Sequence, residues 1–117
     1  MAAGRHLRLG AQGEQRAASW YAAQGYVVVA RNWRCREGEI DLVVWSRRSD
    51  LVFCEVKTRS SDRFGLPAEA VTVAKQRRLR RLAARFLAEA GGAGGRSLRF
   101  DVASVVGERV EVIQAAF

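Results

Sequence analysis

The spacing of apolar residues along the chain predicts two helices and five strands. A helical period of three to four residues runs through residues 10–24 and returns in a segment that starts near Pro67 or Thr72 and ends at Ala90. Short runs rich in β-branched and aromatic residues predict the strands, at residues 26–30, 39–45, 51–57, 98–106 and 109–114. We therefore expect a single α/β domain over residues 1–117, with a mixed sheet flanked by helices in the order α-β-β-β-α-β-β.

Glycine-rich and polar segments predict the connections between these elements. The run at residues 91–95 ends the second helix, and Gly107-Glu108 suits a tight hairpin between the last two strands. Residues 46–50 form a loop of ordinary hairpin length, whereas the polar segment 31–38 allows either a continued strand or a turn. We expect two further segments to be flexible: residues 1–8 and 60–66.

The composition excludes several classes of protein. An apolar content of 49% suits a packed core and excludes a disordered basic tail. Two cysteines and the single His6 are too few for a disulfide scaffold or a four-ligand zinc site, and they make a histidine-based hydrolase implausible. The N-terminus lacks the apolar segment of a signal peptide, and no run approaches the roughly 20 apolar residues of a membrane span. We therefore expect a cytoplasmic protein without a membrane partner.

Positive charge is concentrated in the second predicted helix. The chain has 20 Lys and Arg against 12 Asp and Glu, a net charge of +8, and residues 73–90 supply six of these cations against Glu89 alone. Such an excess indicates a polyanionic partner, most often nucleic acid, although a generally basic surface also keeps a protein in solution. The candidate residues for nucleic-acid binding are Arg59, Lys75, Gln76, Arg77, Arg78, Arg81 and Arg85.

Acidic residues and a lysine fall on one face of the predicted hairpin between the second and third strands. Residues two apart in a strand share a face, so Glu39 and Asp41 point the same way, and Glu55 and Lys57 do so on the neighbouring strand. A regular hairpin then places Asp41 opposite Glu55. The same register places Glu39 opposite Lys57. Two facing carboxylates repel each other, and a divalent cation is the natural compensation.

This set of residues suits metal-assisted hydrolysis of a phosphodiester. Mg²⁺ takes oxygen ligands and is typically held by one or two carboxylates together with substrate phosphate, which makes Asp41 and Glu55 the candidate ligands. The Lys57 ammonium beside the metal can orient or deprotonate a water and offset charge on the phosphate. The alternative is an edge hairpin with solvated charges, in which Glu-x-Lys is a chance pattern.

The same segments resemble a known nuclease superfamily. Gly-Glu-Ile-Asp at residues 38–41, followed by Glu-Val-Lys at residues 55–57, is similar to the core of the PD-(D/E)XK nucleases. Three further segments extend the likeness to the YraN family of small bacterial proteins, over roughly residues 7–113: residues 9–14, 75–78 and 99–102.

The resemblance implies a restriction-endonuclease-like fold, similar to that of archaeal Holliday junction resolvases. It assigns Asp41 and Glu55 as ligands of Mg²⁺ or Mn²⁺ and Lys57 as the catalytic lysine. In resolvase-like members a glutamate at the place of Glu14 assists metal binding; the alternative for this chain is a glutamate favoured there by the helix dipole. The Pro-Asp pair of the superfamily is replaced here by Ile40-Asp41.

Several other residues have two interpretations each. Glu39 is either an acceptor that holds Lys57 in place or half of a simple hairpin ion pair. Lys75 lies on the inward side of the second helix, where it either reaches a phosphate or extends past the edge of the core. Asp101 is more typical of a structural carboxylate paired with an arginine. The three tryptophans suit packing, and Trp33 is the one candidate for stacking on a base.

These features predict an endonuclease that uses Mg²⁺ or Mn²⁺ to hydrolyse phosphodiester bonds in DNA, in recombination or repair. A domain of this size has no separate sequence-reading part, which favours structure-specific or non-specific recognition. A homodimer would supply two active sites for two strands. The alternatives are a non-catalytic nucleic-acid-binding module with the same fold, and an interaction protein whose charge is incidental.

Overall fold

The structure, a computed structural model, describes residues 2–46, 49–59 and 71–117. These residues form two helices and five strands in the predicted order: α1 (Ala2–Ala23), β1 (Tyr26–Cys35), β2 (Gly38–Ser46), β3 (Asp50–Arg59), α2 (Val73–Ala90), β4 (Ser97–Val106) and β5 (Arg109–Ile113). The segment 60–66, predicted to be flexible, and Pro67, one of the two predicted helix starts, lie outside the described residues.

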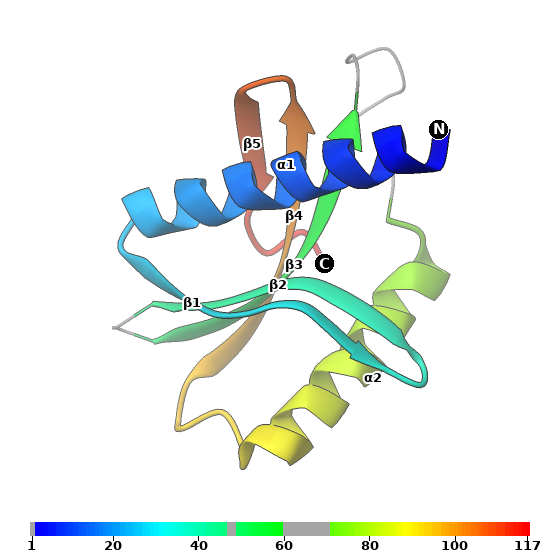
Figure 1. Ribbon diagram of the computed structural model, residues 1–117. Helices are drawn as coiled ribbons and strands as arrows, with labels where there is room; N and C mark the ends of the chain where they lie inside the picture. Colours follow the sequence, from blue (N-terminus) through cyan, green and yellow to red (C-terminus); the bar gives the residue numbers. More distant parts are fainter. Residues whose placement is uncertain (1, 47–48, 60–70) are drawn as a thin grey trace.

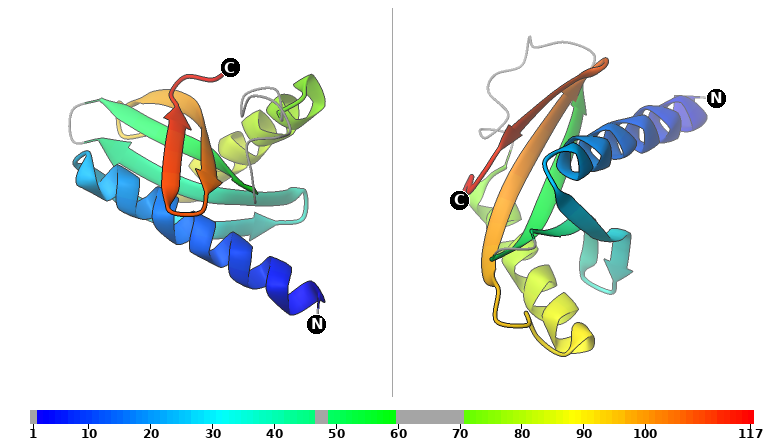
Figure 2. Two further views of the ribbon diagram at one scale, coloured as in Figure 1. Left: turned by 90° about the horizontal axis from the view of Figure 1, so that it is seen from above. Right: turned by 90° about the vertical axis from the view of Figure 1, so that its left-hand side faces the viewer.

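The strands form one mixed sheet in the order β1-β2-β3-β4-β5. β3 and β4 run parallel, and the other neighbouring pairs are antiparallel. α1 crosses one face of the sheet diagonally, and α2 packs against the opposite face (Figures 1 and 2). The predicted α/β domain with a mixed sheet and two flanking helices is confirmed. No helix within the described residues has both the length and the apolar character needed to cross a membrane.

α1 is longer than the sequence predicted. It begins at Ala2, eight residues before the predicted start at residue 10. Glycines at positions 4, 10 and 13 have low helix propensity and interrupt the apolar pattern, which is why the periodicity indicated a later start. The flexibility expected for residues 1–8 stays a prediction.

α2 has a capping residue at each end. The hydroxyl of Thr72 accepts a hydrogen bond from the backbone N–H of Lys75 (3.2 Å), which confirms the predicted helix start near Thr72. Gly91 follows the last turn with φ 84°, a left-handed conformation that glycine adopts without steric cost. Its N–H donates to the carbonyl of Leu87 and so satisfies one of the free acceptors at the helix end.

The hairpin of β2 and β3 has the predicted register, but it is shorter than predicted. Residues 42–45 pair with residues 54–51, so that the four pairs fall where the sequence placed them. The pairing ends at that point, one step before Asp41 and Glu55. The prediction that these two carboxylates form a directly opposed ladder pair is therefore wrong.

The remaining connections follow the sequence-based expectations. β1 continues through Cys35, so the ambiguous segment 31–38 is a strand extension followed by a turn. Val106 pairs with Arg109 across the two-residue Gly107-Glu108 hairpin.

Successive residues of β3 alternate between two apolar clusters, which therefore lie on opposite faces of the sheet. The cluster beneath α2 contains Ile40, Val43, Leu51, Phe53, Leu79, Leu82, Ala83, Phe86 and Phe100. The cluster beneath α1 contains Ala17, Ala18, Tyr21, Leu42, Val44, Val52, Cys54 and Ala103. The two helices thus each bury their apolar stripe against a different side of one sheet.

β2 departs from strict alternation at its start. Ile40 packs with Val43 beneath α2, whereas Leu42 packs beneath α1. Regular alternation, on which the predicted faces of this strand rest, would put Ile40 and Leu42 on the same face. The irregularity falls around Asp41, the residue between them.

Trp33 belongs to the core. Its ring meets the Phe86 ring edge to face with centroids 5.5 Å apart, and it packs against the cluster beneath α2. This placement corrects the suggestion that Trp33 is available for stacking on a base and supports the packing role that was its alternative.

Candidate metal and catalytic site

Three carboxylates converge where α1 passes the start of β2. Ligand oxygens of Glu14, Glu39 and Asp41 lie within 4.8 Å of one another, and all three residues are partly buried. Glu14 comes from α1, and the other two are separated by one residue on β2. Within the described part of the chain, no other group of three or more potential metal ligands comes this close together. We call Glu14, Glu39 and Asp41 the acidic cluster.

The ionised form of Asp41 is disfavoured by its surroundings in this cluster. Burial raises the pKa of Asp41 to about 7, and the negative charges of Glu55, Glu14 and Glu39 act in the same direction. The backbone N–H of Val56 opposes them, because it donates to Oδ2 of Asp41 (2.8 Å) and favours the ionised form. The cluster therefore holds more negative charge than its neighbours neutralise.

Glu14 points into the cluster and has a partner that the sequence did not indicate. Burial raises the pKa of the Glu14 carboxyl, while a hydrogen bond from the side chain of Asn32 lowers it. Asn32 lies in β1 with φ 50°, a left-handed conformation that asparagine tolerates better than most residues. The one available signal for Asn32 was its residue type, because its backbone conformation is set by the tertiary fold.

Lys57 pairs with Glu55 rather than with Glu39. Its Nζ lies 3.4 Å from Oε1 of Glu55, with both side chains largely buried. Glu39 instead meets Arg34 of β1, the residue opposite it, with 3.2 Å between Nε and Oε2. The predicted Glu39–Lys57 contact is wrong, because the β2–β3 pairing ends before Glu39 while the β1–β2 pairing continues past it.

The two lysines of the chain meet beside the acidic cluster. The other 18 cationic residues are arginines. Lys75, in the first turn of α2, has its pKa lowered mainly by the charge of Lys57 and by a hydrogen bond with it. Lys75 thus stands beside Lys57, and the role predicted for it stays a prediction. Two ammonium groups so close together favour an anion between or beside them.

Residues 13–105 match the model of the uncharacterised protein family UPF0102. The chain belongs to this family. A UPF0102 protein of Frankia alni is 55% identical over 114 residues, which cover 93% of each chain. A UPF0102 protein of Moorella thermoacetica is 49% identical over 116 residues, covering 94% of this chain and 95% of its own. These matches confirm the resemblance to the YraN (UPF0102) family, and the relation to PD-(D/E)XK nucleases stays a prediction.

The acidic cluster of this UPF0102 protein fits a hard divalent cation. Its three members offer carboxylate oxygens, the ligands that Mg²⁺ and Mn²⁺ prefer, rather than the thiol or imidazole groups that suit softer metals. A cation would offset the repulsion that contributes to the raised pKa of Asp41. Compared with the predicted ligand set, Glu14 and Asp41 are in the cluster, Glu39 joins them, and Glu55 lies beside Asp41 as the partner of Lys57.

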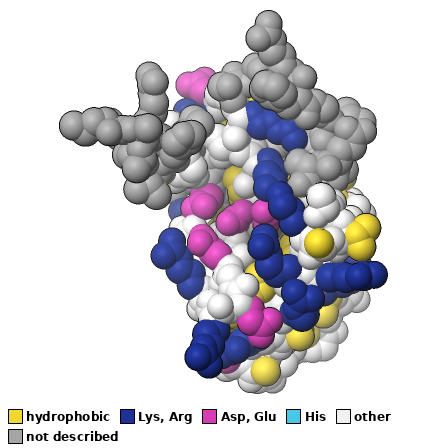
Figure 3. Space-filling model, turned by 90° about the vertical axis from the view of Figure 1, so that its right-hand side faces the viewer, with side chains coloured by type: hydrophobic (Ala, Val, Ile, Leu, Met, Phe, Trp, Pro, Cys, Tyr) yellow, Lys and Arg dark blue, Asp and Glu magenta, His cyan; other side chains and the backbone are white. Residues whose placement is uncertain are grey.

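Acidic and basic side chains lie close together on one face of the molecule. Acidic side chains gather in the middle of one face, with Lys and Arg side chains around them (Figure 3). Glu37, at the β1–β2 turn, lies 3.7 Å from Arg81 and 3.8 Å from Arg85, so two of the arginines predicted to bind nucleic acid already face a carboxylate. Arg77 and Arg78 are exposed near the start of α2. Gln76 donates its side-chain amide to the carbonyl of Val71 (3.2 Å), which indicates a local capping role.

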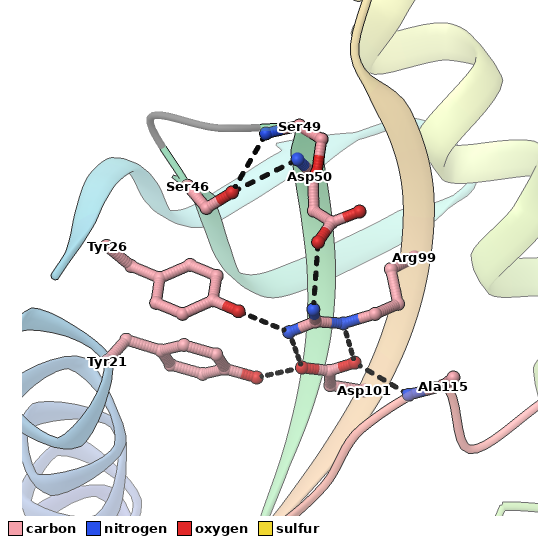
Figure 4. Close-up of polar contacts among 8 residues, drawn as sticks. All are labelled: Tyr21, Tyr26, Ser46, Ser49, Asp50, Arg99, Asp101 and Ala115. Carbon is pink, nitrogen blue, oxygen red and sulfur yellow. Dashed lines mark hydrogen bonds and ion pairs between the residues drawn. The ribbon is translucent and has the colours of Figure 1, made fainter. Parts of the chain in front are cut away.

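A buried hydrogen-bond network fixes α1 to the other end of the sheet (Figure 4). Asp101 is fully buried and accepts a hydrogen bond from the hydroxyl of Tyr21 on α1 (2.6 Å). Arg99 forms an ion pair with Asp101 (2.9 Å), which confirms the structural role predicted for this carboxylate. The further members of the network are Tyr26, Asp50 and the backbone N–H of Ala115.

Proposed function

We propose that this protein is a Mg²⁺- or Mn²⁺-dependent endonuclease that hydrolyses phosphodiester bonds in DNA. The observation that carries the proposal is the convergence of Glu14, Glu39 and Asp41 within 4.8 Å, next to the Glu55–Lys57 pair. Carboxylates of this kind would hold the cation. Once bound, the cation would polarise the phosphoryl oxygen and offset the negative charge that develops on it.

Lys57 is the proposed proton-transfer group. Glu55 holds its ammonium at 3.4 Å, which orients Nζ while leaving the side chain 25% exposed to an incoming substrate. In this position Nζ can orient a water molecule and exchange a proton with it. An arginine could not replace it in this role, since a guanidinium stays protonated at neutral pH.

Lys75 is the proposed phosphate contact. It stands beside Lys57 and lies in the first turn of α2, at the border of the acidic cluster. A non-bridging phosphate oxygen placed between the two lysines would relieve their mutual repulsion and be drawn toward the carboxylate-bound cation. The pair would therefore select an anionic substrate for a site that otherwise repels anions.

DNA is the proposed substrate because the surface around the site is basic. The chain has a net charge of +8, and exposed Arg77 and Arg78 lie on α2 next to Lys75. Contacts of this type bind the phosphate backbone without reading bases. We accordingly propose structure-specific or non-specific cleavage in the cytoplasm, with a homodimer as the arrangement that would act on two strands.

A nicking assay with metal titration tests the proposal. Wild type should nick supercoiled, flapped or four-way DNA in Mg²⁺ or Mn²⁺ and be inactive in EDTA. Asp41→Asn should lose activity, whereas Glu108→Gln, which removes the same charge from an exposed position of the β4–β5 hairpin outside the acidic cluster, should keep it. Wild type that is inert on all these DNAs and on RNA, with either metal, would contradict the proposal and favour a non-catalytic nucleic-acid-binding module.

A further inference from the structure

Gly13 and Thr58 mark an unusually close approach of α1 to the sheet. A Cβ atom at Gly13 would overlap Oγ1 of Thr58 and lie 3.1 Å from its Cβ and 3.2 Å from its Cγ2. Rotation about χ1 of Thr58 can move Oγ1 aside, but it leaves the Cβ–Cβ distance at 3.1 Å. Carbon atoms in ordinary contact are about 3.5–4.0 Å apart. Any side chain at position 13 would therefore have to push α1 and β3 apart.

This contact lies next to the acidic cluster on both elements. Gly13 precedes Glu14, and Thr58 follows Lys57. Other hydrogen bonds also anchor α1: Gln15 accepts from Arg31 of β1 (2.7 Å), Arg16 donates to the Gly107 carbonyl (2.5 Å), and Tyr21 bonds to Asp101. The bonds of Gln15 and Arg16 are exposed and are made through long arginine side chains, which can follow a small shift of the helix. Tyr21 is eight residues from Gly13, about 12 Å along the helix axis. It can hold that end of α1 but does not fix the height of Glu14 above the sheet.

We propose that Gly13 is a positioning residue for the metal site. Because it has no side chain, α1 can rest directly on Thr58, and this contact sets the position of the Glu14 carboxylate relative to Glu39 and Asp41 on β2. The inference rests on the proposed function, since it assigns Glu14 to metal binding. Metal sites require ligand positions to be held within about 0.5 Å, and the shift needed to accommodate a methyl group is of that order.

Gly10 supplies a matched control on the same helix. A Cβ at Gly10 meets no atom within 4 Å, so Gly10→Ala and Gly13→Ala bring the same gain in helix propensity and differ in the contact with β3. Thr58→Gly removes all three atoms that a methyl group at position 13 would strike: Cβ, Oγ1 and Cγ2. The informative set is wild type, both glycine variants, Thr58→Gly and the double variant Gly13→Ala/Thr58→Gly.

The experiment measures Mn²⁺ affinity by calorimetry and the urea unfolding midpoint of each protein. Gly10→Ala should bind Mn²⁺ as wild type does and unfold at a higher midpoint. Gly13→Ala should bind about 10- to 100-fold more weakly, the size of effect typical of residues that orient metal ligands. The double variant should recover most of this loss, which a general loss of stability would not explain.

Three results would overturn the inference, and they can be told apart. If wild type binds Mn²⁺ and folded Gly13→Ala binds it equally well, the positioning role is wrong while the metal site stands. If Gly13→Ala does not fold, the double variant decides in its place: wild-type affinity supports the inference, and persistent weak binding contradicts it. Failure of wild type to bind Mn²⁺ would remove the metal site, and the proposed function with it.

Discussion

Replacing Asp41 by asparagine should stabilise the metal-free protein above neutral pH. Burial and the charges of Glu55, Glu14 and Glu39 raise the pKa of Asp41 from its ordinary value of 3.8 to about 7. The folded protein therefore binds this proton more tightly than the unfolded chain does. Asparagine has nearly the same shape and can still accept the 2.8 Å hydrogen bond from the Val56 N–H through its side-chain carbonyl. The substitution thus removes the charge and keeps the contact.

The sign and size of the effect follow from proton linkage. For a carboxyl whose pKa is higher in the folded state, the free energy of unfolding falls as pH rises from about 4 to about 7 and then levels off. A tenfold change in proton affinity is about 1.4 kcal/mol, so a rise from 3.8 to about 7 corresponds to about 4 kcal/mol. Solvent reaches part of the side chain and screens the charge. We therefore expect Asp41→Asn to gain about 2–4 kcal/mol at pH 8 and almost nothing at pH 4.

Urea unfolding in EDTA, followed by tryptophan fluorescence between pH 4 and pH 8, measures this difference. Glu108→Gln is the control, since it removes one exposed carboxylate that is not part of the acidic cluster and should give a small difference at every pH. Addition of Mg²⁺ should raise the stability of wild type and leave Asp41→Asn unchanged. A stability difference that does not grow between pH 4 and pH 8 would refute the charge cost that we assign to Asp41.

Three further predictions concern other parts of the molecule. Lys57→Arg should abolish cleavage and leave DNA affinity nearly unchanged, as nicking and fluorescence anisotropy assays can show; active folded Lys57→Arg would exclude the proton-transfer role. Glu37→Gln should strengthen DNA binding and steepen its salt dependence, because it frees Arg81 and Arg85 for phosphate contacts. Tyr21→Phe should cost about 1.5–3 kcal/mol in urea unfolding, because it removes the 2.6 Å hydrogen bond to a buried carboxylate; a loss below about 0.5 kcal/mol would contradict this.

Local signals in the sequence were sufficient for most of the fold. β-branched runs, helix periodicity and glycine at turns are properties of neighbouring residues, and they predicted the element order and the register of residues 42–45. The missed start of α1 also has a local origin, because glycines at positions 4, 10 and 13 lower helix propensity and interrupt the apolar pattern.

In the candidate site, too, local sequence patterns predicted the residues but not all of their partners. Asp41, Glu55 and Lys57 were predictable from their spacing on two strands, and Glu14 from its place on the inward side of a helix. The ion pairs that form instead of Glu39–Lys57, between Glu39 and Arg34 and between Lys57 and Glu55, were not predictable from the sequence. They depend on where each pairing ends, and pairing ends are set by sheet twist and packing rather than by residue type.

The end of the β2–β3 pairing links the fold to the chemistry. Had the register continued, Asp41 would have been a ladder residue with its side chain alternating with those of Ile40 and Leu42. Instead the Asp41 carboxylate accepts the hydrogen bond from the Val56 N–H, so a charged side-chain group replaces a backbone carbonyl as the acceptor. The Asp41 carboxylate thus lies in the acidic cluster with Glu14. Its raised pKa indicates that the ionised carboxylate destabilises the folded protein while no cation is present. A neutral residue would satisfy the same N–H at lower cost, so stability alone does not account for a carboxylate here, whereas the proposed binding of a divalent cation does.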